Sequence, residues 1–200
     1  MSGTFVLISY GMGGDAIDAA ASSGGGEDYL KARCKKLPNV HTVNSVYQWS
    51  DTQQRYNDVR AIKRANPSAK IVLVGDSLGD NEIGDDLAYL EQAGIEVDLV
   101  CGFQGSVWGK HTQITANCKR ALIIFNPVWL ETMGLGDYPL PLVKPPILKD
   151  GESLFDGKWR TGNDGKTQVR YVQIEAPHPD DWGLAQDLAF HEIAALAKAA

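Results

Sequence analysis

Two kinds of hydrophobic pattern alternate along most of this chain. Short runs of aliphatic and β-branched residues, typical of buried strands, are separated by stretches whose apolar residues recur at helical spacing. The strand-like runs cover residues 4–10, 40–49, 70–75, 95–103, 120–129 and 168–176. Strands that alternate with helices form parallel sheets with helices on both faces. We therefore expect an α/β fold, a three-layer sandwich around a mostly parallel central sheet.

The stretches between these runs carry helix signals. Residues 27–37 read as a helix, and Asp51 followed by Gln54 is typical of the start of a second one, which ends by Pro67. A third helix runs until Gly94, and a fourth closes the chain. Their apolar positions are Ile83, Leu87 and Leu90 in the third helix, and Leu184, Leu188, Ile193 and Leu196 in the fourth.

The length of the chain suits one domain. Its 200 residues can bury a sizeable core, and no internal repeat or linker divides them, so we expect a single domain over residues 1–200. Residues 134–168 are rich in glycine and proline and lack clear periodicity. We expect a long excursion there, with a hairpin, a lid over the site, or a plain surface loop as the alternatives.

Composition and charge argue against several classes of protein. The net charge of −6, with scattered basic residues, leaves no basic stripe for the phosphates of a nucleic acid. No apolar run approaches the ~18 residues of a membrane span, and no basic leader precedes the first strand. Cys34, Cys101 and Cys118 are widely spaced, which favours neither disulfides nor a zinc site. We expect a cytoplasmic protein without a metal, with Cys101 in the core.

The sequence Gly75-Asp76-Ser77-Leu78-Gly79 directly ends a buried strand and precedes a helix. It fits the G-x-S-x-G pattern of the nucleophile elbow, in which the glycines permit a turn too tight for a β-carbon. The serine hydroxyl is then exposed at the carboxyl end of a central strand, where open α/β sheets bind ligands. The pattern predicts Ser77 as a nucleophile, and the plainer alternative is an ordinary strand-to-helix turn.

A serine nucleophile needs a base that accepts its proton. His178 lies on a proline-flanked turn just after the last strand-like run, at the sheet edge where a base would meet Ser77. The other histidines lie in a strand, a short connection and the closing helix, and we expect no catalytic role for them: His41, His111 and His191.

This arrangement resembles the α/β-hydrolase superfamily over most of the chain, at the level of element order. In that family the nucleophile follows a strand preceded by βα units, the histidine follows the last strand, and the oxyanion loop follows the first. The corresponding places here hold Ser77, His178 and the segment Tyr-Gly-Met-Gly-Gly at 10–14. The resemblance implies a cofactor-free serine esterase whose oxyanion is bound by the backbone N–H groups of Met12 and Leu78.

The sequence departs from the family pattern in several places. Tyr10-Gly11 stands where the family usually has His-Gly, and Asp76 stands where a histidine is common before the serine. The first antiparallel strands of the family are missing, as in its small cutinase-like members. A finer resemblance is to small hydrolase-like proteins of bacteriophages and prophages. The second hypothesis is therefore a phage-type binding or structural module that keeps the hydrolase scaffold with an incomplete site.

The acid of the triad is the weakest match. The family places it after the strand at 120–129, where Glu131 and Asp137 are the candidates, and we expect Glu131. Asn126, at the end of that strand, is an alternative group to orient the histidine. One strand earlier the corresponding residue is Gln104, which cannot be an anion.

Residues 75–81 also resemble the first block of the GDSL/SGNH esterases, and residues 175–179 resemble their closing block. In that interpretation the serine and the histidine keep their roles, and the acid and the oxyanion donors change: Glu175 for the acid, and Gly102 or Gly105 with Asn126 for the donors. That family begins with its serine block, whereas two βα units come first here. Its Gly-x-Asn-Asp block is missing at the expected distance, because Gly-Asn-Asp at 162–164 lies too close to the histidine.

The sequence Pro-His-Pro-Asp-Asp at 177–181 resembles the zinc motif of sugar N-deacetylases. Here it closes the chain, and no partner histidine has zinc spacing, so we expect no metal site.

Three tryptophans fall just after strands, where they either line the crevice beside Ser77 or simply pack: Trp108, Trp129 and Trp182. In the crevice they would bind acyl chains or sugar rings. We expect a small-molecule or cell-envelope ester as the substrate and no cofactor.

Overall fold

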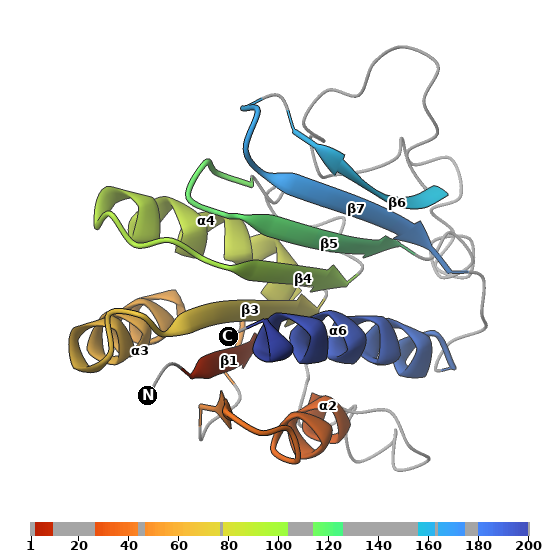
Figure 1. Ribbon diagram of the computed structural model, residues 1–200, viewed down its shortest axis with the longest axis horizontal. Coiled ribbons are helices and arrows are strands. Elements are labelled where there is room, and N and C mark those ends of the chain that lie inside the picture. Colours follow the sequence, from red (N-terminus) through yellow and green to blue (C-terminus); the bar gives the residue numbers. More distant parts are fainter. Residues whose placement is uncertain are drawn as a thin grey trace.

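The structure is a computed structural model (Figure 1), and it describes residues 3–9, 27–43, 47–76, 78–103, 114–125, 156–162, 164–174 and 180–199. Within these ranges strands and helices alternate much as the sequence predicts. In chain order they are β1 (Thr4–Ser9), α2 (Glu27–Cys34), β2 (Val40–Thr42), α3 (Thr52–Ala65), β3 (Lys70–Asp76), α4 (Leu78–Gln92), β4 (Leu99–Phe103), β5 (Arg120–Phe125), β6 (Asp156–Thr161), β7 (Gln168–Gln173) and α6 (Asp180–Lys198).

The strands of the described residues form one seven-stranded sheet in the order β2-β1-β3-β4-β5-β7-β6. Neighbouring strands are parallel except β6 and β7, which form an antiparallel hairpin at one edge. The prediction of an α/β fold with a mostly parallel sheet is confirmed.

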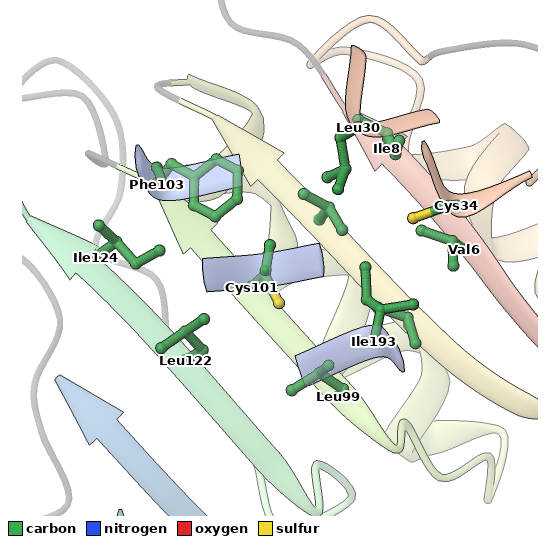
Figure 2. Close-up of a cluster of buried hydrophobic side chains, with 14 of the residues drawn as sticks. Val6, Ile8, Leu30, Cys34, Leu99, Cys101, Phe103, Leu122, Ile124 and Ile193 are labelled. Carbon is green, nitrogen blue, oxygen red and sulfur yellow. The ribbon is translucent and has the colours of Figure 1, made fainter. Parts of the chain in front are cut away.

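Helices cover both faces of this sheet (Figure 1), and each face has its own core. Successive residues of a strand point to opposite faces. In β3, Val72 and Val74 pack in the core shared with α2 and α6, while Ile71 and Leu73 pack in the core shared with α3 and α4. Figure 2 shows the first of these cores, with turns of α6 over β4. The two cores confirm three layers.

All the parallel strands end at the same edge of the sheet, which lies to the right in Figure 1. From β1 the chain moves outward to β2, and from β3 it moves in the opposite direction to β4. The neighbouring strands β1 and β3 therefore form the switch point of the sheet. In open α/β sheets ligands bind at such a point, beyond the carboxyl ends of the strands.

The hairpin of β6 and β7 accounts for the last part of the excursion predicted over 134–168. Its turn is held by Asp164, whose carboxylate accepts hydrogen bonds from the backbone N–H groups of Lys166 and Thr167 (both 2.9 Å). Gly165 follows with a φ of 69°. Residues 126–155 lie outside the described ranges, so the alternative of a lid stays a prediction.

Several strand boundaries differ from the sequence prediction. β2 covers only Val40–Thr42 of the predicted 40–49, although Tyr47 still bridges Ser9 of β1. β4 begins at Leu99, not at residue 95. Apolar side chains continue beyond the paired backbone in both cases, and this made the strands look longer in the sequence.

Two helix details are also corrected. Asp51 precedes α3 but makes no side-chain cap; its carboxylate accepts a hydrogen bond from the backbone N–H of Gln48 instead (2.9 Å). Leu184, predicted on the apolar face of α6, is 48% exposed. Ala185, Ala189 and Ile193 form the fully buried face of that helix.

The cysteines are free and buried in the cores. Burial raises the pKa of the Cys34 and Cys118 thiols to about 12, and Cys101 lies in the core shared with α6, as predicted. In the part of the chain that is described, no helix has the length and apolar character needed to span a membrane.

Candidate active site

The connection between β3 and α4 is a single residue. β3 ends at Asp76 and α4 begins at Leu78. Ser77, between them, lies outside the described residues. The junction stands at the carboxyl edge, on the strand beside the switch point. The strand predicted before Ser77 and the helix predicted after it are therefore both present.

Gly75 is crowded by the start of α4. A β-carbon at this position would lie 2.6 Å from the carbonyl oxygen of Gly79 and 2.7 Å from the backbone nitrogen of Asp80. It would also lie 2.6 Å from Cδ1 of Ile83. Because backbone atoms cannot move aside without shifting the helix, only glycine fits. This is the crowding that the sequence predicted for Gly75.

A row of small residues lets the first turn of α4 approach the sheet. Ser9, Gly75 and Gly102 are register partners on β1, β3 and β4. A β-carbon on Gly102 would collide with Oδ1 of Asp80, a residue that is 1% exposed. The Asp80 carboxyl group is therefore buried between the first turn of α4 and β4, where the positive end of the helix dipole favours an anion.

Asp76 is the second buried carboxyl group of this junction, and it faces the other side of the sheet. It continues the alternating series of Val72 and Val74, which pack in the core shared with α6. It is 5% exposed, and its register partner Phe103 belongs to the same core. Asp76 and Asp80 thus flank Ser77 in the sequence and lie on opposite faces of the sheet.

On the face of the sheet that α4 covers, Arg55 of α3 forms hydrogen bonds with the segment that follows β2. Arg55 is 1% exposed, although a guanidinium is costly to bury without partners. Arg55 donates to a carboxylate oxygen, Asp86 Oδ2 (2.6 Å), and to two carbonyl oxygens of that segment, Gln48 (2.9 Å) and Trp49 (3.3 Å). It also donates to the hydroxyl of Thr52, the first residue of α3 (2.9 Å). One buried cation therefore fixes the path of the chain next to the end of β1.

Arg55 offsets only part of the cost of burying the charge of its partner, Asp86. Burial raises the pKa of Asp86 to about 6, although the charge of Arg55 lowers it; Glu82 and Asp85 on the same helix raise it further. Among the described residues, Oδ1 of Asp86 has no hydrogen-bond partner. The ionised carboxylate therefore costs free energy in the folded state.

We expect this cost to appear in the pH dependence of stability. The pKa of Asp86 is about 6 in the folded protein and 3.8 for an ordinary aspartate, so the folded state binds a proton first as the pH falls. The contribution of Asp86 to the free energy of unfolding should therefore rise between pH 7 and pH 4, by about 2–3 kcal/mol. Urea unfolding of the wild type and of Asp86→Asn at several pH values measures it, because asparagine does not titrate. If the difference in the free energy of unfolding between the two proteins stays constant or shrinks as the pH falls, the charge of Arg55 outweighs burial in its effect on the pKa of Asp86.

Most of the predicted site residues lie outside the described ranges: Ser77, His178, Glu131, Met12, Trp108 and Trp129, with the alternatives Asp137, Asn126, Gln104, Gly105 and Glu175. Two others are described by their backbone. Leu78 is the first residue of α4, and Trp182 lies in the first turn of α6. The first N–H groups of a helix have no partner within it, and the Leu78 N–H therefore meets one requirement of an oxyanion donor.

The GDSL/SGNH interpretation loses part of its support. Asp164 of the Gly-Asn-Asp sequence lies in the turn that precedes β7, at the edge opposite to the end of β3. It is too far from Ser77 to belong to the same site. Gly102 lies inside the sheet, paired with Gly75 and Ile123, where the ladder uses the backbone N–H groups.

Two of the remaining histidines have the ordinary environments that the sequence predicted. His41 of β2 stacks on Phe5, with ring centroids 4.8 Å apart. His191 is exposed on α6 and meets the edge of Phe190 at 6.0 Å. His111 lies outside the described residues.

The burial of Asp76 and Asp80 was not predicted from the sequence. Two signals point to it. Asp76 follows Val72 and Val74 at every second position of a buried strand. Gly102 interrupts an apolar strand, which often marks a place where another group approaches closely; here that group is Asp80.

Within the ranges that the structure describes, no three or more His, Cys, Asp or Glu side chains gather as a metal site would require. Comparisons with protein-family models, curated proteins and solved structures returned no match.

Proposed function

We propose that this protein is a serine hydrolase that cleaves carboxylic esters through an acyl-enzyme at Ser77. The observation that carries the proposal is the β3–α4 junction. One residue connects a buried central strand to a helix, and Gly75 lies against the backbone of that helix. A nucleophile elbow requires this crowding, and an ordinary strand-to-helix connection does not.

In the proposed reaction, Oγ of Ser77 attacks the carbonyl carbon of the ester while His178 accepts the hydroxyl proton. The backbone N–H groups of Met12 and Leu78 stabilise the oxyanion. When the tetrahedral intermediate collapses, the bond to the alcohol oxygen breaks and His178 gives that oxygen the proton. Water then attacks the acyl-serine, His178 takes a proton from the water and returns it to Ser77, and the acid leaves.

The course of the chain around His178 supports this pairing. β7 is parallel to the central strands, so the chain leaves it at the same edge as it leaves β3. β7 and β3 are three strand spacings apart, which is ~14 Å. The six steps from Ile174 to Asp180 can span up to ~20 Å. A residue of this segment can therefore reach the end of β3.

A fluorophosphonate probe tests the proposal. Folded wild-type protein should be labelled stoichiometrically, with the adduct on the peptide that contains Ser77. Ser77→Ala should lose the label and at least about a thousandfold in the hydrolysis of p-nitrophenyl acetate. Ser68→Ala, which changes an exposed serine between α3 and β3, is the matched control and should behave as the wild type.

Failure of the folded wild type to react would sink the proposal and favour the second hypothesis, a binding module with an incomplete site. Ser77 would then act as a helix cap, since it precedes α4 and Asp80 follows three residues later. In that case Ser77→Ala would cost about 1 kcal/mol of stability and nothing else.

A further inference from the structure

We propose that Asp76 is the acid that orients His178, in place of Glu131. The inference rests on the proposed function. It names the missing member of the triad from a residue that the structure describes, immediately before the nucleophile.

Asp76 lies on the face of the sheet that α6 covers. Its position in the β3 series and its register partner Phe103 both assign it to the face covered by α6. His178 precedes the first residue of α6, Asp180, by two positions. The chain that carries the proposed base thus enters a helix on the same face as Asp76. Asp80, equally buried, lies on the opposite face beneath α4.

The first turn of α6 lies at the level of the end of β3. Nζ of Lys70, at the start of β3, donates to the carbonyl oxygen of Leu196 near the end of α6 (2.8 Å). The end of α6 thus lies near the start of β3, and Figure 1 shows the helix running antiparallel to this strand. From Lys70 to Asp76 the strand rises ~20 Å, and ~20 Å along the helix from Leu196 leads back to Gly183. Asp76 is thus level with the first turn of α6.

Independent contacts agree with this alignment. Ala185, Ala189 and Ile193 of α6 share one core with Leu99, Cys101 and Phe103 of β4, the strand beside β3. Figure 2 shows turns of α6 over this strand, with Ile193 near Leu99 at its beginning and another turn near Phe103 at its end.

The chemistry suits a carboxylate in this place. By accepting a hydrogen bond from the Nδ1–H group of His178, Asp76 would hold the tautomer whose Nε2 faces Ser77, and it would stabilise the imidazolium formed when the serine gives up its proton. No proton passes to Asp76. Because Asp76 is 5% exposed, water competes little for its oxygens, and the interaction keeps its strength.

The test compares rates of fluorophosphonate labelling in the wild type, Asp76→Asn, Asp80→Asn and Glu131→Gln across pH. Asp76→Asn should slow labelling about 10³–10⁴-fold at neutral pH. It should also shift the pH profile to lower pH, because the imidazolium loses its anion. Glu131→Gln should label at the wild-type rate. Asp80→Asn is the matched control, because Asp80 is equally buried on the opposite face of the sheet. It should keep the wild-type pH profile even if the substitution changes the stability of the protein.

An Asp76→Asn protein that is folded and labels at the wild-type rate would overturn the inference while leaving the hydrolase proposal intact. A large loss in Glu131→Gln alone would do the same. If the wild type is not labelled, the hydrolase proposal is refuted, and the contact between Asp76 and His178 is then tested by measuring the pKa of His178 by NMR. The pKa of His178 should be lower in Asp76→Asn than in the wild type, and equal values overturn the contact itself.

The wild type alone provides a check if Asp76→Asn does not fold. Nuclear Overhauser effects should connect the His178 ring to the ring of Phe103, the register partner of Asp76. Their absence would overturn the inference.

Discussion

Replacing Gly75 with alanine is expected to destabilise the folded protein by about 3 kcal/mol. The added carbon would lie 2.6–2.7 Å from the carbonyl oxygen of Gly79 and the backbone nitrogen of Asp80. Relief requires the first turn of α4 to move away from β3, and this would also displace the residue between them. Urea unfolding measures the loss, and the residual folded protein should label more slowly with fluorophosphonate.

The matched control is the same change at Gly183 of α6. Among the described residues, a β-carbon there meets no atom within 4 Å. Alanine is also the better helix former, so Gly183→Ala should stabilise the protein by about 0.5–1 kcal/mol. If both substitutions changed stability equally, the crowding at Gly75 would not be what requires a glycine.

Replacing Glu192 with alanine is expected to cost about 2–4 kcal/mol. Glu192 of α6 is 11% exposed and joins two strands: Oε2 accepts from Arg120 of β5 (2.8 Å), and Oε1 accepts from Arg170 of β7 (2.9 Å). Arg120 also lies over the ring of Trp159 at 4.1 Å. Without Glu192, two partly buried guanidinium groups would lose the carboxylate that they share.

The control for Glu192 is Asp187, which lies on the same helix and forms an ion pair with Arg33 of α2. Its side chain is 50% exposed, and pairs of this kind contribute about 1 kcal/mol or less. Chemical unfolding of Asp187→Ala and Glu192→Ala compares them directly. Equal losses would mean that Glu192 does not anchor α6 to the sheet.

The sheet could be predicted because its strands are buried on both faces. β3 and β5 are apolar almost throughout, which is typical of central parallel strands. β6, with the sequence Asp-Gly-Lys-Trp-Arg-Thr, gave no such signal. It is an edge strand with a register irregularity, and its pairing with β7 and the turn at Asp164 define it.

The candidate site was predictable only in part. The glycine requirement at Gly75 follows from a local pattern, so the sequence contained it. The burial of Asp80 against Gly102 and the bond between Arg55 and Asp86 join elements distant in the chain, and no local pattern reports such contacts. The face of the sheet on which Asp76 lies could be predicted from the alternating side chains of β3. Its position next to α6 could not, because that depends on how the helix packs across the sheet.

The most direct test of the account is a crystal structure of the phosphonylated protein. We expect phosphorus bonded to Oγ of Ser77, at the junction of β3 and α4, with Nε2 of His178 within ~3.2 Å of that oxygen. An adduct on another side chain, or His178 at a distant edge of the sheet, would contradict it.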